Sequence, residues 1–253
     1  KLDFATGSAE SIIATTTAST TNRDIKLSRV NVTNYIDVGA YSNVVCNSVT
    51  AASLTIADSP EGSTIANNPT AVIKDSDIDS VTTGARMLKA ELNGLRASTA
   101  IVGKETSSVE IKSLSAASNI GTLTIGDNCG TTTIEGNLNG KNTTIGTLTV
   151  GTGTNPTLGA NTSSNATKDQ KLVITTINSQ GRTTIESGKY ETLNGDGTKN
   201  TFVLYGGNYP TDYSQYCACD QDSNTGYYDH YVCKYQTAEG RYRIEQLTPK
   251  VLS

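Results

Sequence analysis

The chain has 253 residues with a net charge of −4, and Lys and Arg are outnumbered by Asp and Glu. This balance, without a long basic run, argues against a nucleic-acid partner. No segment approaches the roughly 18 consecutive apolar residues of a membrane span. Charged residues are only 17% of the chain, so uncharged Thr, Ser and Asn supply most of its polarity. Recurring Ile, Leu and Val argue against disorder, and we expect a β-rich fold with hydroxyl groups on its outer face.

The first half of the chain predicts a cap followed by short strands. Residues 1–24 are rich in Ser, Thr and Ala, and we expect a cap or first partial rung there. Strand patterns follow, bounded by turn-forming residues: Ile25–Val30, Val44–Cys46 and Ser53–Ile56. Residues 60–108 are the least regular. Within them, Ala85–Leu92 fits a short helix ended by Asn93-Gly94. Alternatively, Met87–Leu92 is a strand in a rung with longer loops; we favour the strand, because a helix would interrupt the core.

A duplicated block organises the chain. Ile120–Gly126 returns as Ile145–Gly151 after about 25 residues, which is typical of stacked repeats. Each copy is short and bounded by Gly, as expected of a β-strand. Side chains alternate along a strand, so Leu123 should face inward while Thr122 and Thr124 face outward. A strand that recurs with the same face inward predicts a β-solenoid.

A second repeat extends this pattern. Ile185–Tyr190 and Leu204–Tyr209 share the form apolar-x-small-Gly-x-Tyr. The strand spacing suits a three-sided, single-stranded parallel β-helix over residues 25–209. The crossover preference of parallel strands predicts that it is right-handed. Residues 210–253 are rich in Tyr and Cys, and we expect a C-terminal cap there.

The cap should contain a β-hairpin. Asp229–Tyr235 and Arg241–Ile244 read as two strands joined by the turn Thr237–Gly240. This hairpin would seal the last rung. The fold class predicted is therefore all-β: a right-handed parallel β-helix closed by a C-terminal hairpin.

The end of the chain resembles a known family. The stretch Leu204–Cys219 and the closing hairpin resemble the repeat end of pectate-lyase-like parallel β-helix surface proteins of gut bacteria. The matching positions are Gly206, Gly207, Tyr209, Asp212, Tyr216, Cys217, Ala218, Gly240 and Tyr242. The resemblance implies pectate-lyase-like architecture and a location on the bacterial exterior, but no activity.

Carbohydrate-active enzymes occur among parallel β-helices, and a pair of carboxylates on one face would indicate such an activity. Hydrolysis of a glycosidic bond needs two carboxylates on one face, about 5–10 Å apart. Asp75, Asp77 and Asp79 alternate in sequence and offer the best arrangement, as a catalytic or a calcium site. The further motifs of galacturonan hydrolases are missing, and acidic residues in a loop are usually just solvated. We therefore expect no catalytic residue.

Three cysteines and the one histidine lie in the tail. Cys217, Cys219, His230 and Cys233 would suit tetrahedral zinc in their residue types. A disulfide and simple core packing of thiols are the alternatives. The sequence leaves the choice open, and we predict no metal and no cofactor.

Tyrosines gather near the same end, where a flat ring with a hydroxyl can stack on a sugar. The candidate ligand-binding residues are Tyr205, Tyr209, Tyr213 and Tyr216. The competing interpretation is that the cluster forms the core of the cap.

The outward threonines suggest a different ligand. Thr122 with Thr124 and Thr147 with Thr149 should stack in register, as threonines do on several ice-binding solenoids. A useful plane needs many rungs, and only two clear copies are visible. We therefore expect ordinary strand residues on a solvated face, and look for a specific site in residues 60–108 or in the cap.

These observations favour a secreted or surface-displayed protein, outside the cell or on the bacterial surface. Its expected role is structural or adhesive, binding glycans or a host or partner protein as a monomer. A polysaccharide lyase or glycoside hydrolase is the second hypothesis. A trimeric phage tail fibre is the third, and a native mass would test it.

Overall fold

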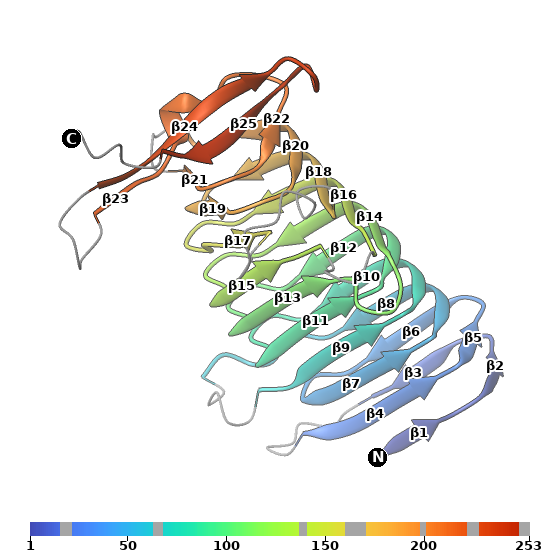
Figure 1. The fold of residues 1–253 in the computed structure, drawn as a ribbon. Helices are drawn as coiled ribbons and strands as arrows, with labels where there is room; N and C mark the ends of the chain where they lie inside the picture. The colour runs from blue at the N-terminus through green and yellow to red at the C-terminus, as the bar shows by residue number, and fades with distance from the viewer. Residues whose placement is uncertain are drawn as a thin grey trace, which may run out of the picture.

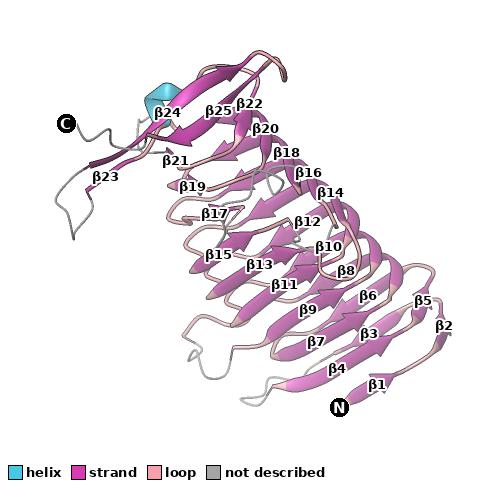
Figure 2. Ribbon diagram, in the orientation of Figure 1, coloured by secondary structure: helices cyan, strands magenta, loops and turns pink. Residues whose placement is uncertain are grey.

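The computed structural model describes residues 1–15, 22–62, 68–136, 141–159, 171–197, 201–221 and 228–247. The chain forms a coil of stacked parallel strands, with the N-terminus at one end and a hairpin at the other (Figure 1). In the described residues the one helical element is a 3₁₀ turn, η3 (Ser214–Tyr216) (Figure 2). No helix in this part of the chain is long and apolar enough to cross a membrane. The all-β parallel β-helix predicted from the sequence is confirmed.

Two long sheets run the length of the coil. Sheet A has ten parallel strands, which stack in this order: β1 (Leu2–Phe4), β4 (Arg23–Ser28), β7 (Ser42–Asn47), β9 (Thr70–Lys74), β11 (Lys89–Asn93), β13 (Ser108–Lys112), β15 (Thr131–Ile134), β17 (Thr157–Leu158), β19 (Thr183–Ile185) and β21 (Phe202–Leu204). Sheet B contains the strands between them: β2 (Gly7–Ala9), β5 (Val30–Val32), β8 (Thr50–Ile56), β10 (Asp77–Thr83), β12 (Arg96–Val102), β14 (Ser118–Ile125), β16 (Thr143–Val150), β18 (Leu172–Ser179), β20 (Lys189–Asn194) and β22 (Asn208–Tyr209). Strand β6 (Tyr35–Val38) also pairs with β8, and β3 (Ile12–Ala14) pairs with β6.

The strands of sheet B bend, and this bend gives the coil its third side. In β14, Ile120 and Leu123 are buried, whereas the two residues between them are both exposed. The same pair of outward residues interrupts the alternation in every long strand from β8 to β20. A Cβ on Gly146 would lie 2.5 Å from the carbonyl oxygen of Gly121, so glycine allows the stacked corners to approach closely.

Columns of apolar side chains fill the inside of the coil. Leu54, Val81, Ala100, Leu123, Leu148 and Ile177 follow one another in register from β8 to β18, and none has exposed surface. Burial of a Leu or Ile side chain contributes about 1.5–3 kcal/mol relative to exposure. Each rung covers the apolar residues of its neighbours, so the core is continuous along the axis.

The regions that looked irregular belong to the same coil. Residues 1–15 supply β1, β2 and β3, which pair with β4, β5 and β6 as a rung. Lys89–Asn93 is strand β11, so the strand interpretation of Met87–Leu92 is confirmed from Lys89 onward and the helix alternative is wrong. Strands β9 to β12 stack in register with their neighbours, so residues 68–108 continue the solenoid without interruption.

A hairpin closes the C-terminal end, as predicted. Strands β24 (Tyr228–Gln236) and β25 (Arg241–Gln246) are antiparallel, and β23 (Cys219–Gln221) pairs with β24. Strand β25 also pairs with β22 and covers the last edge of sheet B. Arg241 fixes the hairpin through two hydrogen bonds to the Glu191 carboxylate, at 2.9 and 3.1 Å. Covering an edge in this way blocks further strand pairing.

Candidate functional site

Two glutamates lie side by side on the outer face of sheet A. Glu91 of β11 and Glu110 of β13 are directly paired in register. Like charges in this position repel, and Glu91 is only 6% exposed. Lys89 bridges them, with its Nζ 3.0 Å from Glu91 Oε2 and 2.9 Å from Glu110 Oε1. Opposite charge therefore holds the two carboxylates together.

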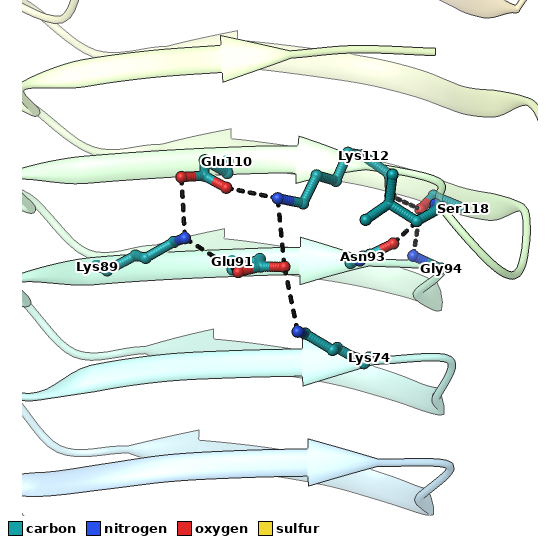
Figure 3. Close-up of polar contacts among 9 residues, drawn as sticks. Lys74, Lys89, Glu91, Asn93, Gly94, Glu110, Lys112 and Ser118 are labelled. Carbon is teal, nitrogen blue, oxygen red and sulfur yellow. Dashed lines mark hydrogen bonds and ion pairs between the residues drawn. The ribbon is translucent and has the colours of Figure 1, made fainter. Parts of the chain in front are cut away.

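Two further lysines complete the network (Figure 3). Lys112 Nζ lies 2.6 Å from Glu110 Oε2 and 3.4 Å from Glu91 Oε1. Lys74 Nζ lies 3.7 Å from Glu91 Oε1 and is the most exposed of the three lysines. Glu91 thus contacts lysines from its own strand and from both neighbouring strands, and it forms the centre of the network.

Buried polar groups fix the turn at the end of this face. After β11 the chain turns at Gly94, whose φ is +68°, a conformation that favours glycine. The Gly94 backbone N–H donates to Ser118 Oγ at 3.0 Å, and Ser118 Oγ donates to the Lys112 carbonyl at 2.7 Å. Asn93 Oδ1 accepts from the Leu114 N–H at 2.9 Å. These bonds tie two successive rungs together beside the charge network.

The charges change the pKa values of the network. Burial alone would raise the pKa of Glu91, but the hydrogen bond from Lys89 and the charges of Lys112, Lys89 and Lys74 outweigh it, so that the pKa is lowered. The hydrogen bond from Lys112 is the main cause of the lowered pKa of Glu110. For Lys89, hydrogen bonds to both glutamates outweigh burial and raise the pKa. Both carboxylates are therefore held in the charged form.

The network makes stability depend on acid. In the folded protein the pKa values of Glu91 and Glu110 are lowered, whereas in the unfolded chain they are near the ordinary 4.5. The unfolded chain therefore binds protons at a higher pH than the folded protein does. Their contribution is present above about pH 4.5 and is lost as the pH falls through the folded-state pKa values. We expect the Tm to decrease below about pH 4.5, and Glu91→Gln to weaken that decrease. A Tm that stays constant in acid would contradict this.

A hollow of about 320 Å³ adjoins the network on sheet A. Glu110 and Lys112 of β13 lie on one side of it, and Thr131 and Thr133 of β15 on the other. Glu135, just after β15, completes the lining at the turn. Hydroxyl, carboxylate and ammonium groups therefore border one open space, and together they offer hydrogen-bond donors and acceptors to a ligand placed there.

The two carboxylates of this hollow differ in acidity. Burial is the main reason that the pKa of Glu135 is raised, although the charge of Lys112 opposes it. The pKa of Glu110 is lowered, chiefly by its hydrogen bond from Lys112. Two carboxyl groups whose environments push their pKa values apart are typical of acid–base pairs.

The aspartate trio does not form one row. The strand begins at Asp77, whereas Asp75 lies in the preceding turn with a φ of +48°. Asp75 accepts a hydrogen bond from Ser115, Asp77 pairs with Arg96 at 2.7 Å, and Asp79 accepts from Ser98. None of the three lines the hollow on sheet A. The alternation of the three aspartates in sequence would place them on one side of a strand, but the turn removes Asp75 from β10, so the three do not share a strand face.

The tail cysteines are only partly described. Cys217 and Cys233 are free thiols, and burial, with the nearby Cys233 and Asp212, raises the pKa of Cys217 to about 11. Cys219 and His230 are paired backbone positions of β23 and β24, but their side chains lie outside the described residues. Among the side chains that are described, no group of three or more His, Cys, Asp or Glu gathers to hold a metal ion.

The candidate tyrosines pack on the last rungs. Tyr209 has no exposed surface and stacks on Tyr190, with ring centroids 5.6 Å apart, so its ring offers no face to a sugar. Tyr213 packs edge-on against Tyr209, and its hydroxyl accepts from the Leu193 N–H at 3.3 Å. Tyr205 and Tyr216 are also partly buried. Ligand binding by Tyr205, Tyr213 and Tyr216 stays a prediction.

Sequence reasoning did not select Glu91, Glu110, Lys112 or Glu135. The sequence signal for this site is two short alternations of opposite charge, Lys89-x-Glu91 and Glu110-x-Lys112. They indicate a charge network only once the register that pairs Glu91 with Glu110 is known. Comparison of the chain with family models, with curated proteins and with solved structures gives no match in any of the three.

Proposed function

We propose that the protein is a secreted or bacterial surface-displayed adhesive β-helix that binds an extended glycan along sheet A. The observation that carries this proposal is the hollow of about 320 Å³ beside the charge network. That volume is at the lower end of ligand sites, which span about 300–1,000 Å³. The pectate-lyase-like, gut-bacterial attribution rests on the motifs of residues 204–242 alone.

The register of sheet A gives the site a direction. Ile134, Leu158, Ile185 and Leu204 are paired in sequence from β15 to β21. The residues that follow these four in the chain therefore form one column along the axis of the coil. Glu135 and Tyr205 are the two ends of this column and lie three rungs apart. At about 4.8 Å per rung, the column spans about 14 Å. A short stretch of polysaccharide would reach from the hollow to the partly exposed Tyr205.

A specific observation also favours the second candidate, a glycoside hydrolase. Glu110 is opposite Thr133, and Glu135 lies two residues further along, in the diagonal position. A spacing of about 4.8 Å between strands and about 6.6 Å for two residues along a strand puts the backbones of Glu110 and Glu135 about 8 Å apart. Inverting glycosidases separate their carboxyl groups by about 6.5–9.5 Å. Glu135, with its raised pKa, would be the acid, and Glu110 the base.

One experiment separates the two candidates. The protein is applied to an array of plant, fungal, mucin and bacterial oligosaccharides, and each bound glycan is then assayed for new reducing ends or unsaturated products. We expect retention without products, and weaker retention for Glu135→Gln. Products that disappear in Glu135→Gln while retention persists would establish the hydrolase instead. Absence of retention for every glycan would contradict both candidates.

A further inference from the structure

The part of each sheet B strand that follows the bend carries a regular array of outward side chains, most of which have hydroxyl groups. Beyond the bend, two outward positions per strand stack in register from β8 to β20. The first column contains Ser53, Ser80, Thr99, Thr122, Thr147, Thr176 and Thr192. The second column contains Thr55, Thr82, Ile101, Thr124, Thr149, Asn178 and Asn194. We call these fourteen positions the threonine array.

The array is longer than the duplicated block suggested. The expectation of two useful rungs came from exact copies of one motif, whereas the register aligns seven rungs. The first column has a hydroxyl on every rung. The second lacks a hydroxyl at Ile101, which is 38% exposed, and at Asn178 and Asn194. A lattice-binding plane needs many rungs, and these seven aligned rungs are more than the two that the repeated motif indicated.

Two properties separate the array from an ordinary strand surface. None of its fourteen positions is charged, whereas the corresponding outward positions of sheet A include Lys89, Glu91 and Glu110. Beyond a hydrogen bond of 2.9 Å from Asn194 to Asn178, its side chains make no hydrogen bond to other residues of the described structure. The hydroxyls are therefore free to bind an external, uncharged partner.

Glycine leaves the middle of the array open. In β14 the two threonines lie between Gly121 and Gly126, and in β16 between Gly146 and Gly151. A Cβ at Gly126 would lie 2.6 Å from the Lys104 nitrogen, so the flanking backbone is packed against the adjacent rung. Glycine therefore flanks the threonines along each of these two strands.

The spacing identifies the chemistry of the partner. Rungs repeat at about 4.8 Å, and alternate residues along a strand are about 6.6–6.8 Å apart. Thr has a restricted χ1, so its hydroxyl and methyl groups hold fixed positions. A stiff two-dimensional array of donors and acceptors matches a surface that repeats on the same scale. The repeat between rungs is close to the shortest repeat of equivalent oxygens in ice.

We propose that the threonine array binds the surface of ice by ordering water in a pattern that continues into the crystal. Each hydroxyl donates one hydrogen bond and accepts others, and water held between protein groups bonds nearly as well as direct contact. A sugar is the weaker match, because the fourteen positions contain no charged side chain and none of them lines the hollow on sheet A. The inference concerns sheet B and does not rest on glycan binding by sheet A.

The test is growth of single ice crystals in the presence of the purified chain. We expect faceted crystals and a measurable thermal hysteresis, and slower recrystallisation in frozen sucrose. Thr149→Lys should abolish these effects, because its charged, hydrated side chain would stand above the plane on the fifth of the seven rungs. Thr133→Lys, an outward threonine of sheet A, is the matched control and should keep them.

Three outcomes would overturn the proposal. The wild-type protein could leave ice crystals round and free to grow. Thr149→Lys, with an unchanged circular dichroism spectrum, could retain full hysteresis. Finally, the protein could sediment with crystalline cellulose or chitin through Thr149 and have no effect on ice, in which case the lattice recognised is a polysaccharide.

Discussion

Replacing Leu148 with alanine should lower the free energy of unfolding by about 2–5 kcal/mol. Leu148 has no exposed surface and lies in register between Leu123 and Ile177. The surrounding side chains are held by their own rungs, so the cavity can collapse only partly. Denaturant unfolding followed by circular dichroism measures the change.

The control for this prediction is the next residue. Thr149 points outward from the same strand, and Thr149→Ala should change the free energy of unfolding by no more than about 0.5 kcal/mol. Equal effects of the two substitutions would mean that the inward and outward faces are assigned wrongly.

Replacing Glu91 with alanine should destabilise the protein by about 1–3 kcal/mol, the usual cost of depriving buried or charged groups of their partner. Glu91 contacts Lys74, Lys89 and Lys112. Its removal takes the Glu91 carboxylate away from Lys74 and leaves Lys89 and Lys112 with Glu110 alone, so that one carboxylate fewer offsets the repulsion among the lysines. Glu91→Gln keeps the size of the side chain and isolates the effect of charge.

Lys74→Ala is the control for Glu91. Its ammonium group is 3.7 Å from Glu91, and its side chain is 44% exposed. Exposed ion pairs contribute about 0–1 kcal/mol, so the Tm should change little. A loss for Lys74→Ala as large as that for Glu91→Ala would contradict the central position of Glu91 in the network.

Features that repeat along the sequence could be predicted. The alternation in Ile120–Gly126 and Ile145–Gly151 indicated short strands with Leu123 inside, and β14 and β16 follow that pattern. The hairpin of β24 and β25 was predicted from its turn and its strand residues. These features depend on local periodicity, which is present in the chain itself.

Features that depend on register could not be predicted. Glu91 and Glu110 lie on different strands, and their pairing appears only when the rungs are stacked. The threonine array was missed because its outer rungs, such as Ser80 with Thr82, do not copy the motif letter by letter. Tyr209 looked available to a ligand, but the preceding rung supplies Tyr190 to cover it.

The central claim, that sheet A recognises a glycan, is tested most directly by titrating the best array ligand into two variants. Thr133 lines the hollow, whereas Thr149 belongs to sheet B. Isothermal titration calorimetry should show that Thr133→Lys loses binding and that Thr149→Lys binds like the wild type. Equal binding by both variants, or loss in Thr149→Lys alone, would contradict the account.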